Sequence, residues 1–357
     1  MLYTYIVYNS ILFFTVFFSY CVEKSPNKVS ERLSRLLLFI SQALPACIRE
    51  GIGTDYWNYV GLYKLYQVDN DDHEVGFQFL ADVLIFFDAH YQWFIIALTV
   101  LALAPICFYV PKKHFSYFSI TYFLLLYLDI IGSSRQDVSV GLIVCGICFL
   151  YQKKGSLKYL VCAALAFLMH YSSALYFSLV LLKKIKISAI PLYIILGVTL
   201  IVTSGASLFE MISQNEMFMD SPYGVYVGSQ YDREANVGSG LGIIANLLIA
   251  IIFIILYPRS SKHINNPGFF AILGILFIGS YILASQIHIF GRLLNIFIFV
   301  PAFLAYPTCK AIWSKFPRFI FCGFVFLYLV LFEKTIAISL STLGNGLGIT
   351  PYQTIFD

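Results

Sequence analysis

The stretch IIANLLIAIIFIILY, at Ile243–Tyr257, decides the fold class of this chain. It is apolar apart from one asparagine and the closing tyrosine, and its residues do not alternate between apolar and polar. A strand of a membrane β-barrel would alternate in this way. An unbroken apolar run instead predicts a helix that is hydrophobic around its whole circumference, as expected of a segment in lipid.

Similar runs recur along the whole chain. Of its 357 residues, 59% are hydrophobic and 12% are charged, whereas a soluble domain carries about 25% charged residues. A water-soluble core could not hide so much apolar surface. The sequence therefore predicts an all-α, polytopic integral membrane helical bundle with about 11–13 transmembrane segments, in a single membrane domain over residues 1–357.

The predicted spans lie between short charged segments. We expect them near residues 2–21, 33–48, 91–110, 115–131, 136–151, 157–169, 171–182, 187–204, 241–257, 268–287, 289–307 and 318–333. The first lacks a basic leader and a small-residue cleavage site, so we interpret it as a retained helix. Residues 76–88 are apolar but short, which predicts a re-entrant or interfacial segment. Residues 157–182 are either one long tilted helix or two half-helices that meet near His170.

The basic residues suggest an orientation. Most fall in six clusters, which the span model places on one side: Lys24, Lys28, Arg32 and Arg35; Lys112 and Lys113; Lys153, Lys154 and Lys158; Lys183, Lys184 and Lys186; Arg259 and Lys262; Lys310, Lys315 and Arg318. The positive-inside rule makes this side cytoplasmic. Two long loops, near residues 49–75 and 205–240, then face outward and hold most of the acidic residues. The inner loops are too short to form a cytoplasmic domain, so chemistry is expected in the membrane or at its outer face. The sequence has no Walker A or GxGxxG motif, which argues against ATP-driven transport by this chain alone.

Three arginines on the predicted outer side, Arg49, Arg135 and Arg292, are candidates for function because topology does not require them there. An arginine close to hydrocarbon costs a few kcal/mol unless it is paired, and its planar fork matches phosphate oxygens. Together the three predict a pyrophosphate cradle. The structural alternative is an ion pair for each, and for Arg135 the nearby acids are Asp129 and Asp137.

The first outer loop combines two glycines, Gly51 and Gly53, with Asp55 and several aromatic residues. Glycines permit tight backbone geometry close to a ligand. A carboxylate for hydroxyls and flat rings for apolar sugar faces suit a glycan. The alternative is an interfacial aromatic belt with one solvated acid.

His170 lies in an apolar run and is followed by the hydroxyl residues Tyr171, Ser172 and Ser173, which favours a proton-transfer or hydrogen-bonding role as much as a structural one. The acidic run at 69–72 resembles a divalent-metal cluster, but a solvated loop is the favoured interpretation. Cys145 and Cys148 form a CxxC inside a hydrophobic run, where we interpret them as small apolar helix residues. The sequence predicts no metal site, no cofactor and no nucleic-acid partner.

An ordered set of short motifs resembles the EpsG-like branch of bacterial polysaccharide polymerases, which includes Wzy-type O-antigen polymerases. The set is Arg49-x-Gly51-x-Gly53-Thr54-Asp55-Tyr56-x-x-Tyr59, Glu74-x-Gly76-Phe77, Arg135-Gln136, His170 with Ser172-Ser173, Arg292 and Pro351-Tyr352. The resemblance spans most of the chain and implies a fold similar to GT-C-like glycan polymerases.

The resemblance also implies a reaction. Such enzymes are inner-membrane glycosyltransferases of lipopolysaccharide biosynthesis, and they join undecaprenyl-pyrophosphate-linked repeat units at the periplasmic face. A separate chain-length regulator protein is a candidate partner. On this reading Arg49, Arg135 and Arg292 bind pyrophosphate, and either Asp55 or His170 is the base. Further candidate substrate-binding residues are Arg233, in a loop that would act as a lid, Tyr56, Tyr59 and Gln136.

Rival functions are a lipid-linked glycan flippase or transporter, a membrane acyltransferase that would make His170 central, an O-antigen ligase and a metal-dependent membrane glycosyltransferase. A flippase would gate at both faces, whereas the unexplained polar residues gather on one predicted face.

Overall fold

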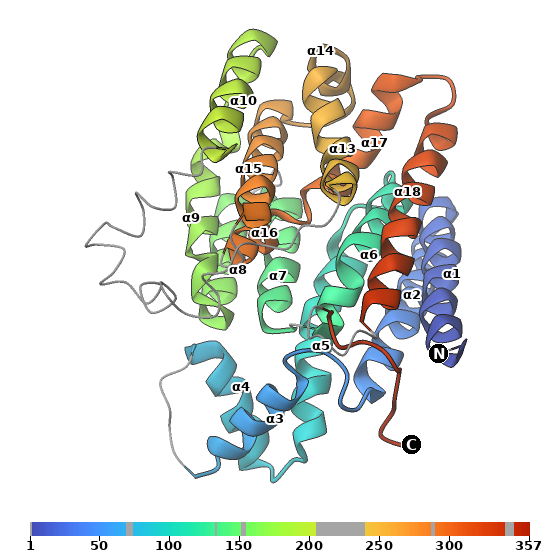
Figure 1. The fold of residues 1–357 in the computed structure, drawn as a ribbon, viewed down its shortest axis with the longest axis vertical. Coiled ribbons are helices and arrows are strands. Elements are labelled where there is room, and N and C mark those ends of the chain that lie inside the picture. Colours follow the sequence, from blue (N-terminus) through green and yellow to red (C-terminus); the bar gives the residue numbers. More distant parts are fainter. Residues whose placement is uncertain are drawn as a thin grey trace, which may run out of the picture. The chain divides into compact units, whose positions relative to one another are not determined.

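The structure of the protein is a computed structural model that describes residues 2–68, 74–132, 134–150, 155–204, 240–286, 290–339 and 346–357. These residues form helices joined by short segments (Figure 1). They divide into two compact units, unit 1 (Met1–Val180 with Tyr328–Asp357) and unit 2 (Leu181–Leu327). The all-α, polytopic fold class is confirmed. The expectation of a single membrane domain stays a prediction.

Unit 1 contains the first long loop and all but two of the predicted site residues. Its elements are α1 (Leu2–Lys24), α2 (Lys28–Ile48), α3 (Tyr56–Leu65), α4 (Val75–Phe86), α5 (Tyr91–Tyr109), α6 (Phe115–Gly132), α7 (Ser134–Leu150), α8 (Gly155–Met169), the 3₁₀ helix η1 (Tyr171–Ala174) and α9 (Leu175–Leu179). Helix α6 lies at the centre of this unit, since nearly all of its side chains are buried. Helices α3 and α4 lie at the lower end of unit 1 in Figure 1, and the C-terminus lies near the same level.

Unit 2 begins within the 3₁₀ helix η2 (Val180–Lys184) and ends within α18 (Pro317–Ile338). Between them lie α10 (Ala189–Ser204), α13 (Leu241–Ile255), α14 (Tyr257–Ser260), the 3₁₀ helix η4 (Ser261–His263), α15 (Pro267–Gln286), α16 (Gly291–Phe297) and α17 (Val300–Ile312). Helix α15 packs against α10, α13, α16 and α17 and so forms the centre of unit 2.

Every predicted span falls on helical structure. Among the described residues, five helices are long and apolar enough to cross a membrane, or up to seven if each of two bent pairs is one span. The five are α1, α5, α6, α15 and α18. The predicted total of 11–13 spans stays a prediction, because the remaining helices are shorter or carry more charge.

The ambiguous stretch 157–182 resolves as two segments that meet at His170. Helix α8 ends at Met169, and the backbone of His170 is extended. Beyond His170 the chain continues as a series of short pieces, η1, α9 and η2, and not as one α-helix. The apolar segment 76–88 corresponds to α4, which is too short to cross a bilayer alone.

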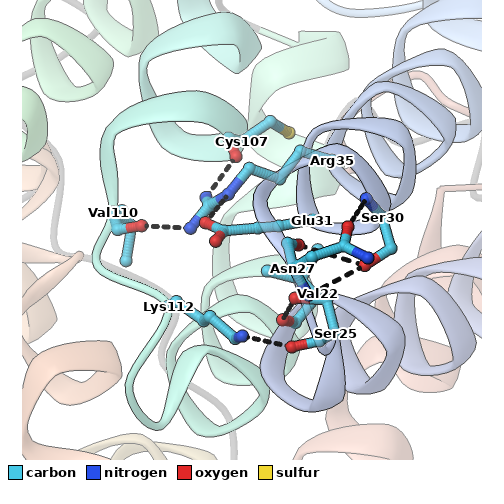
Figure 2. A network of polar contacts seen from close by, with 9 residues as sticks. All are labelled: Val22, Ser25, Asn27, Ser30, Glu31, Arg35, Cys107, Val110 and Lys112. Atoms are coloured by element: carbon cyan, nitrogen blue, oxygen red, sulfur yellow. Dashed lines mark hydrogen bonds and ion pairs between the residues drawn. The ribbon is translucent and has the colours of Figure 1, made fainter.

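Arg35, a member of the first predicted basic cluster, has a structural role. Arg35 is buried, and Figure 2 shows its guanidinium between α2 and the end of α5. It donates to the carbonyls of Cys107 and Val110 at 2.7 and 2.9 Å and to Glu31 at 2.9 Å. A cation at the carboxyl end of α5 satisfies carbonyls that have no partner within the helix. Arg35 therefore joins two helices and does not present its charge to solvent or lipid headgroups.

The same region shows why α2 begins where it does. The amide of Ser30 donates to the side chain of Asn27 at 2.8 Å, and the Asn27 amide donates back to Ser30 at 3.4 Å (Figure 2). This reciprocal pair satisfies donors that the first turn of a helix leaves open. Lys112, in the connection between α5 and α6, donates to the carbonyl of Ser25, in the connection between α1 and α2. The two helix-to-helix connections are thus tied together.

Candidate functional site

Three charged or titratable side chains from three distant segments meet at one end of unit 1. Glu74 accepts from Nη1 of Arg135 at 2.7 Å through Oε2, and its Oε1 lies 2.9 Å from Nδ1 of His170. The Arg135 and His170 positions are separated from Glu74 by 61 and 96 residues. Each oxygen of the Glu74 carboxylate thus contacts a different partner, and these charge-assisted contacts fix the carboxylate between Arg135 and His170.

Local structure explains how these side chains come together. Glu74 precedes the first residue of α4, and Arg135 is the second residue of α7. His170 sits at the break after α8, where its own amide donates to Ala166 and its carbonyl accepts from Ser173. Helix α4 can approach this break closely because Gly76 has no side chain: a Cβ there would lie 2.8 Å from the carbonyl oxygen of Leu168.

Arg135 is the most accessible member of this cluster. Its side chain is 23% exposed, against 10% for Glu74 and for His170. Its guanidinium lies over the ring of Phe77, 5.1 Å from the centroid, an arrangement that favours a cation. Sequence reasoning named Asp129 and Asp137 as ion-pair partners for Arg135, whereas the structure pairs it with Glu74. Among the described residues the Arg135 guanidinium donates to Glu74 alone, so other guanidinium N–H groups are open to an anionic ligand within that part of the chain.

The charge state of Glu74 follows from its neighbours. Burial alone would raise the pKa of this carboxyl, but the hydrogen bond with His170 and the positive charge of Arg135 outweigh burial and bring the pKa below its ordinary value. Glu74 is therefore an anion at neutral pH.

Asp55 is connected to the same region through Tyr59. The Tyr59 hydroxyl accepts from the backbone amide of Arg135 at 3.1 Å and donates to Oδ2 of Asp55 at 3.4 Å. Burial raises the pKa of the Tyr59 phenol, so this hydroxyl stays protonated. Asp55 itself is only partly buried. Of the predicted site residues, the structure thus brings Asp55, Tyr59, Arg135 and His170 into one region.

Arg49 is not open to a substrate in this structure. Its side chain is 1% exposed, and its guanidinium donates to the carbonyl of Ala46 and, at 3.0 Å each, to the hydroxyls of Thr99 and Ser134. Among the described residues its Nε has no hydrogen-bond partner. This geometry indicates a positioning role at the end of α2. A role for Arg49 in binding pyrophosphate stays a prediction.

The sequence suggested that Gly51 and Gly53 bring the backbone close to a ligand. At Gly53 the close contact is with another part of the protein. Gly53 has φ +103°, and a Cβ there would lie 2.3 Å from the carbonyl oxygen of Ile131, at the end of α6. Its amide donates to the carbonyl of Gly348 at 2.9 Å, and the amide of Glu50 donates to that of Gln353 at 3.1 Å. The C-terminal segment, residues 346–357, therefore holds this loop in place.

The aromatic residues of the loop divide by helical periodicity. Tyr56, Tyr59 and Tyr63 are buried on one face of α3, and the Tyr56 hydroxyl donates to Gln92 at 2.9 Å. Tyr56 is thus a packing residue in this structure, and its predicted sugar contact stays untested. Trp57 lies on the other face of α3 and is 59% exposed. The helical spacing of the three buried tyrosines is a sequence signal that could have identified Trp57 as the aromatic residue on the exposed face.

The remaining predicted residues are less informative. Gln136 is buried beside Arg135. Arg292 is the second residue of α16, within unit 2. Arg233 and the acidic run at 69–72 lie outside the described residues. Within the described ranges, no group of three or more His, Cys, Asp or Glu side chains could hold a metal ion. The expectation of metal-free chemistry stays a prediction.

Sequence reasoning placed Glu74 in a motif but not among the site residues, and the structure makes it the centre of the cluster. Its sequence signals are the short motif Glu74-x-Gly76-Phe77 and its position just before a short apolar helix.

The fold and this cluster define a multi-pass membrane protein with a buried carboxylate that bridges an arginine and a histidine. Comparison of the sequence with known families gives a match to the EpsG family over residues 32–354. The chain therefore belongs to the EpsG family, which includes Wzy-type polymerase-like proteins. No curated protein and no solved structure matches the chain.

Proposed function

We propose that this protein is a glycosyltransferase that polymerises undecaprenyl-pyrophosphate-linked oligosaccharide repeat units into O-antigen or a related surface polysaccharide. The reaction takes place at the periplasmic face of the inner membrane. The observation that carries the proposal is the Arg135–Glu74–His170 cluster in a chain of the EpsG family. In this cluster a partly exposed guanidinium and an imidazole ring both contact the same carboxylate, that of Glu74.

In this reaction a hydroxyl of the acceptor unit attacks the anomeric carbon of the growing glycan. The new C–O bond forms as the bond from that carbon to the pyrophosphate oxygen breaks, and the electron pair leaves with undecaprenyl pyrophosphate. The hydroxyl proton passes to a protein base, either Asp55 or His170. Pyrophosphate is already a good leaving group, so the main requirement is to stabilise its developing charge.

Arg135 meets that requirement best among the described residues of unit 1. Its side chain is partly exposed, and a guanidinium can donate two parallel hydrogen bonds to phosphate oxygens. No nucleotide sugar takes part, because the energy for the new bond comes from the lipid-linked pyrophosphate. Trp57 and Asp55 on α3 are candidates for contact with the sugars.

The test is a polysaccharide ladder from cells that lack the gene, complemented with wild type, Arg135→Ala or Arg135→Lys. Arg32→Ala is the matched control, since this arginine is exposed on α2. Membrane levels of each variant are measured by immunoblot. We expect the deletion to leave single repeat units on lipid A, wild type and Arg32→Ala to restore the ladder, and both Arg135 variants to fail. Lysine fails because it lacks the planar fork.

Other outcomes identify the rival functions. Loss of even single repeat units from the outer surface would move the defect upstream and favour a flippase. Accumulation of long polymer on undecaprenyl pyrophosphate, with none on lipid A, would favour an O-antigen ligase. A ladder that disappears with a divalent-metal chelator would favour a metal-dependent glycosyltransferase.

A further inference from the structure

The geometry points to Nε2 of His170 as the atom that takes the acceptor proton, with Glu74 as the positioning residue that presents it. This inference rests on the proposed function and decides a choice that the sequence leaves open between Asp55 and His170. It also gives Glu74 a second task, which is to fix the distance between the base and Arg135.

The tautomer of His170 follows from its contact with Glu74. Nδ1 of the ring lies 2.9 Å from Oε1 of a carboxylate whose other oxygen is held by Arg135 at 2.7 Å. An ionised carboxylate only accepts hydrogen bonds, so Nδ1 carries the proton. The lone pair of the neutral ring is then on Nε2, on the side of the ring away from Glu74. A base must present such a lone pair in a fixed direction.

The backbone leaves Glu74 little freedom to move. It occupies the N-cap position of α4, two residues before Gly76, and the close approach at Gly76 sets α4 against Leu168, two residues before His170. On its other side, the guanidinium of Arg135 packs over Phe77, in the first turn of the same helix. The first turn of α4 therefore fixes the positions of His170 and Arg135 relative to Glu74.

This arrangement couples the two halves of the reaction. The proton leaves the acceptor as negative charge develops on the pyrophosphate, so the base and the cation must be correctly spaced at the same moment. Glu74 joins them through two short hydrogen bonds. Asp55 differs from His170 in its contacts: the Tyr59 hydroxyl donates to it at 3.4 Å, and no bond to Glu74 fixes its distance from Arg135 among the described residues.

The first test is spectroscopic and does not depend on the reaction. The full-length protein, labelled with ¹⁵N-histidine, is reconstituted in lipid nanodiscs at mildly alkaline pH, and His170→Asn identifies the His170 signals. We expect the wild-type ring to carry its proton on Nδ1. In Glu74→Gln the new amide can donate to Nδ1, so the proton moves to Nε2. A wild-type ring protonated on Nε2, or protonated on both nitrogens, would overturn the inference.

The second test uses the polysaccharide ladder. We expect Glu74→Gln and His170→Asn to reduce polymer formation by about 10²–10⁴-fold, the usual contribution of a general base. Glu74→Asp keeps the charge and should recover part of this loss. Asp55→Asn should retain more polymer than His170→Asn. If His170→Asn makes a normal ladder while Asp55→Asn makes none, the base assignment is wrong, although the polymerase proposal stands. If Glu74→Gln does not reach the membrane, the wild-type spectrum and the ladders of the Asp55 and His170 variants still decide whether His170 is the base.

Discussion

A single methyl group at Gly76 should disable the cluster without touching any of its charged residues. A Cβ there would lie 2.8 Å from the carbonyl oxygen of Leu168 and 2.9 Å from its carbonyl carbon. These are backbone atoms and cannot rotate away. Ordinary contact begins at 3.4 Å, so Gly76→Ala requires α4 to retreat from α8 by about 0.6 Å, the difference between 3.4 and 2.8 Å.

That shift moves Glu74 away from His170. Their contact would lengthen from 2.9 Å to about 3.5 Å, where a hydrogen bond is largely lost. Overpacking of this kind costs about 1–3 kcal/mol, and misplacement of catalytic groups on this scale costs up to about 10²-fold in rate. Alanine otherwise favours a helix over glycine by about 1 kcal/mol, so a loss of stability would be steric in origin.

The assay compares Gly76→Ala with Gly61→Ala in α3, where a Cβ would meet no atom within 4 Å. We expect Gly76→Ala to lower the Tm of the purified protein and to shorten the polysaccharide ladder at a normal membrane level. Gly61→Ala should leave the ladder unchanged and leave the Tm unchanged or slightly higher. A Gly76→Ala protein with the Tm and ladder of wild type would refute the claim that this close approach sets the position of Glu74.

Three further predictions concern the free energy of unfolding, and each is followed through the Tm of the purified protein. Arg35→Ala should lower this free energy by about 3–5 kcal/mol, because it removes a buried cation from Glu31 and from two carbonyls at a helix end. The control is Arg32→Ala, an exposed position, where the free energy of unfolding should stay within about 0.5 kcal/mol of wild type. Because the pKa of Glu74 lies below its ordinary value, the folded protein binds fewer protons there than the unfolded chain does. The stability from this ion pair is therefore present at neutral pH and is lost as the pH falls through the folded-state pKa. The Tm advantage of wild type over Glu74→Gln should narrow in acid, and a constant gap would contradict this. Gly53→Ala should cost on the order of 3 kcal/mol, from positive φ and a 2.3 Å approach to the carbonyl oxygen of Ile131; a neutral result would mean that the loop can move off α6.

The helices were predictable from the sequence because lipid imposes a simple rule on it. Runs without charge had to be helical, and each predicted span lies on a helix or on a series of short helical pieces. The break at His170 was one of two alternatives that the sequence left open for residues 157–182, the other being one long tilted helix. The number of crossings was less accessible, because short helices such as α8 are compatible with crossing or with partial insertion.

The site was predictable in part for a different reason. Arg135 and His170 stood out because charged and titratable residues are rare beside apolar runs. Their partner did not, because Glu74 lies 61 residues from one and 96 from the other, and no local pattern encodes such a contact. Arg49 was conspicuous for the same reason as Arg135, but its burial depends on α5, α7 and the C-terminal segment together.

The attachment of residues 346–357 to the first loop sets a time at which the site can form during synthesis. The hydroxyl of Tyr8 donates to the carbonyl of Ile349, 341 residues later, and Tyr352 reaches back 307 residues to Pro45. At about 5–20 residues per second, the ribosome needs about 15–70 s to cover this distance. Until then the first loop lacks the segment that holds Glu50 and Gly53. The loop is therefore among the last parts of unit 1 to mature, and a nascent chain exposes it to membrane proteases for about that long.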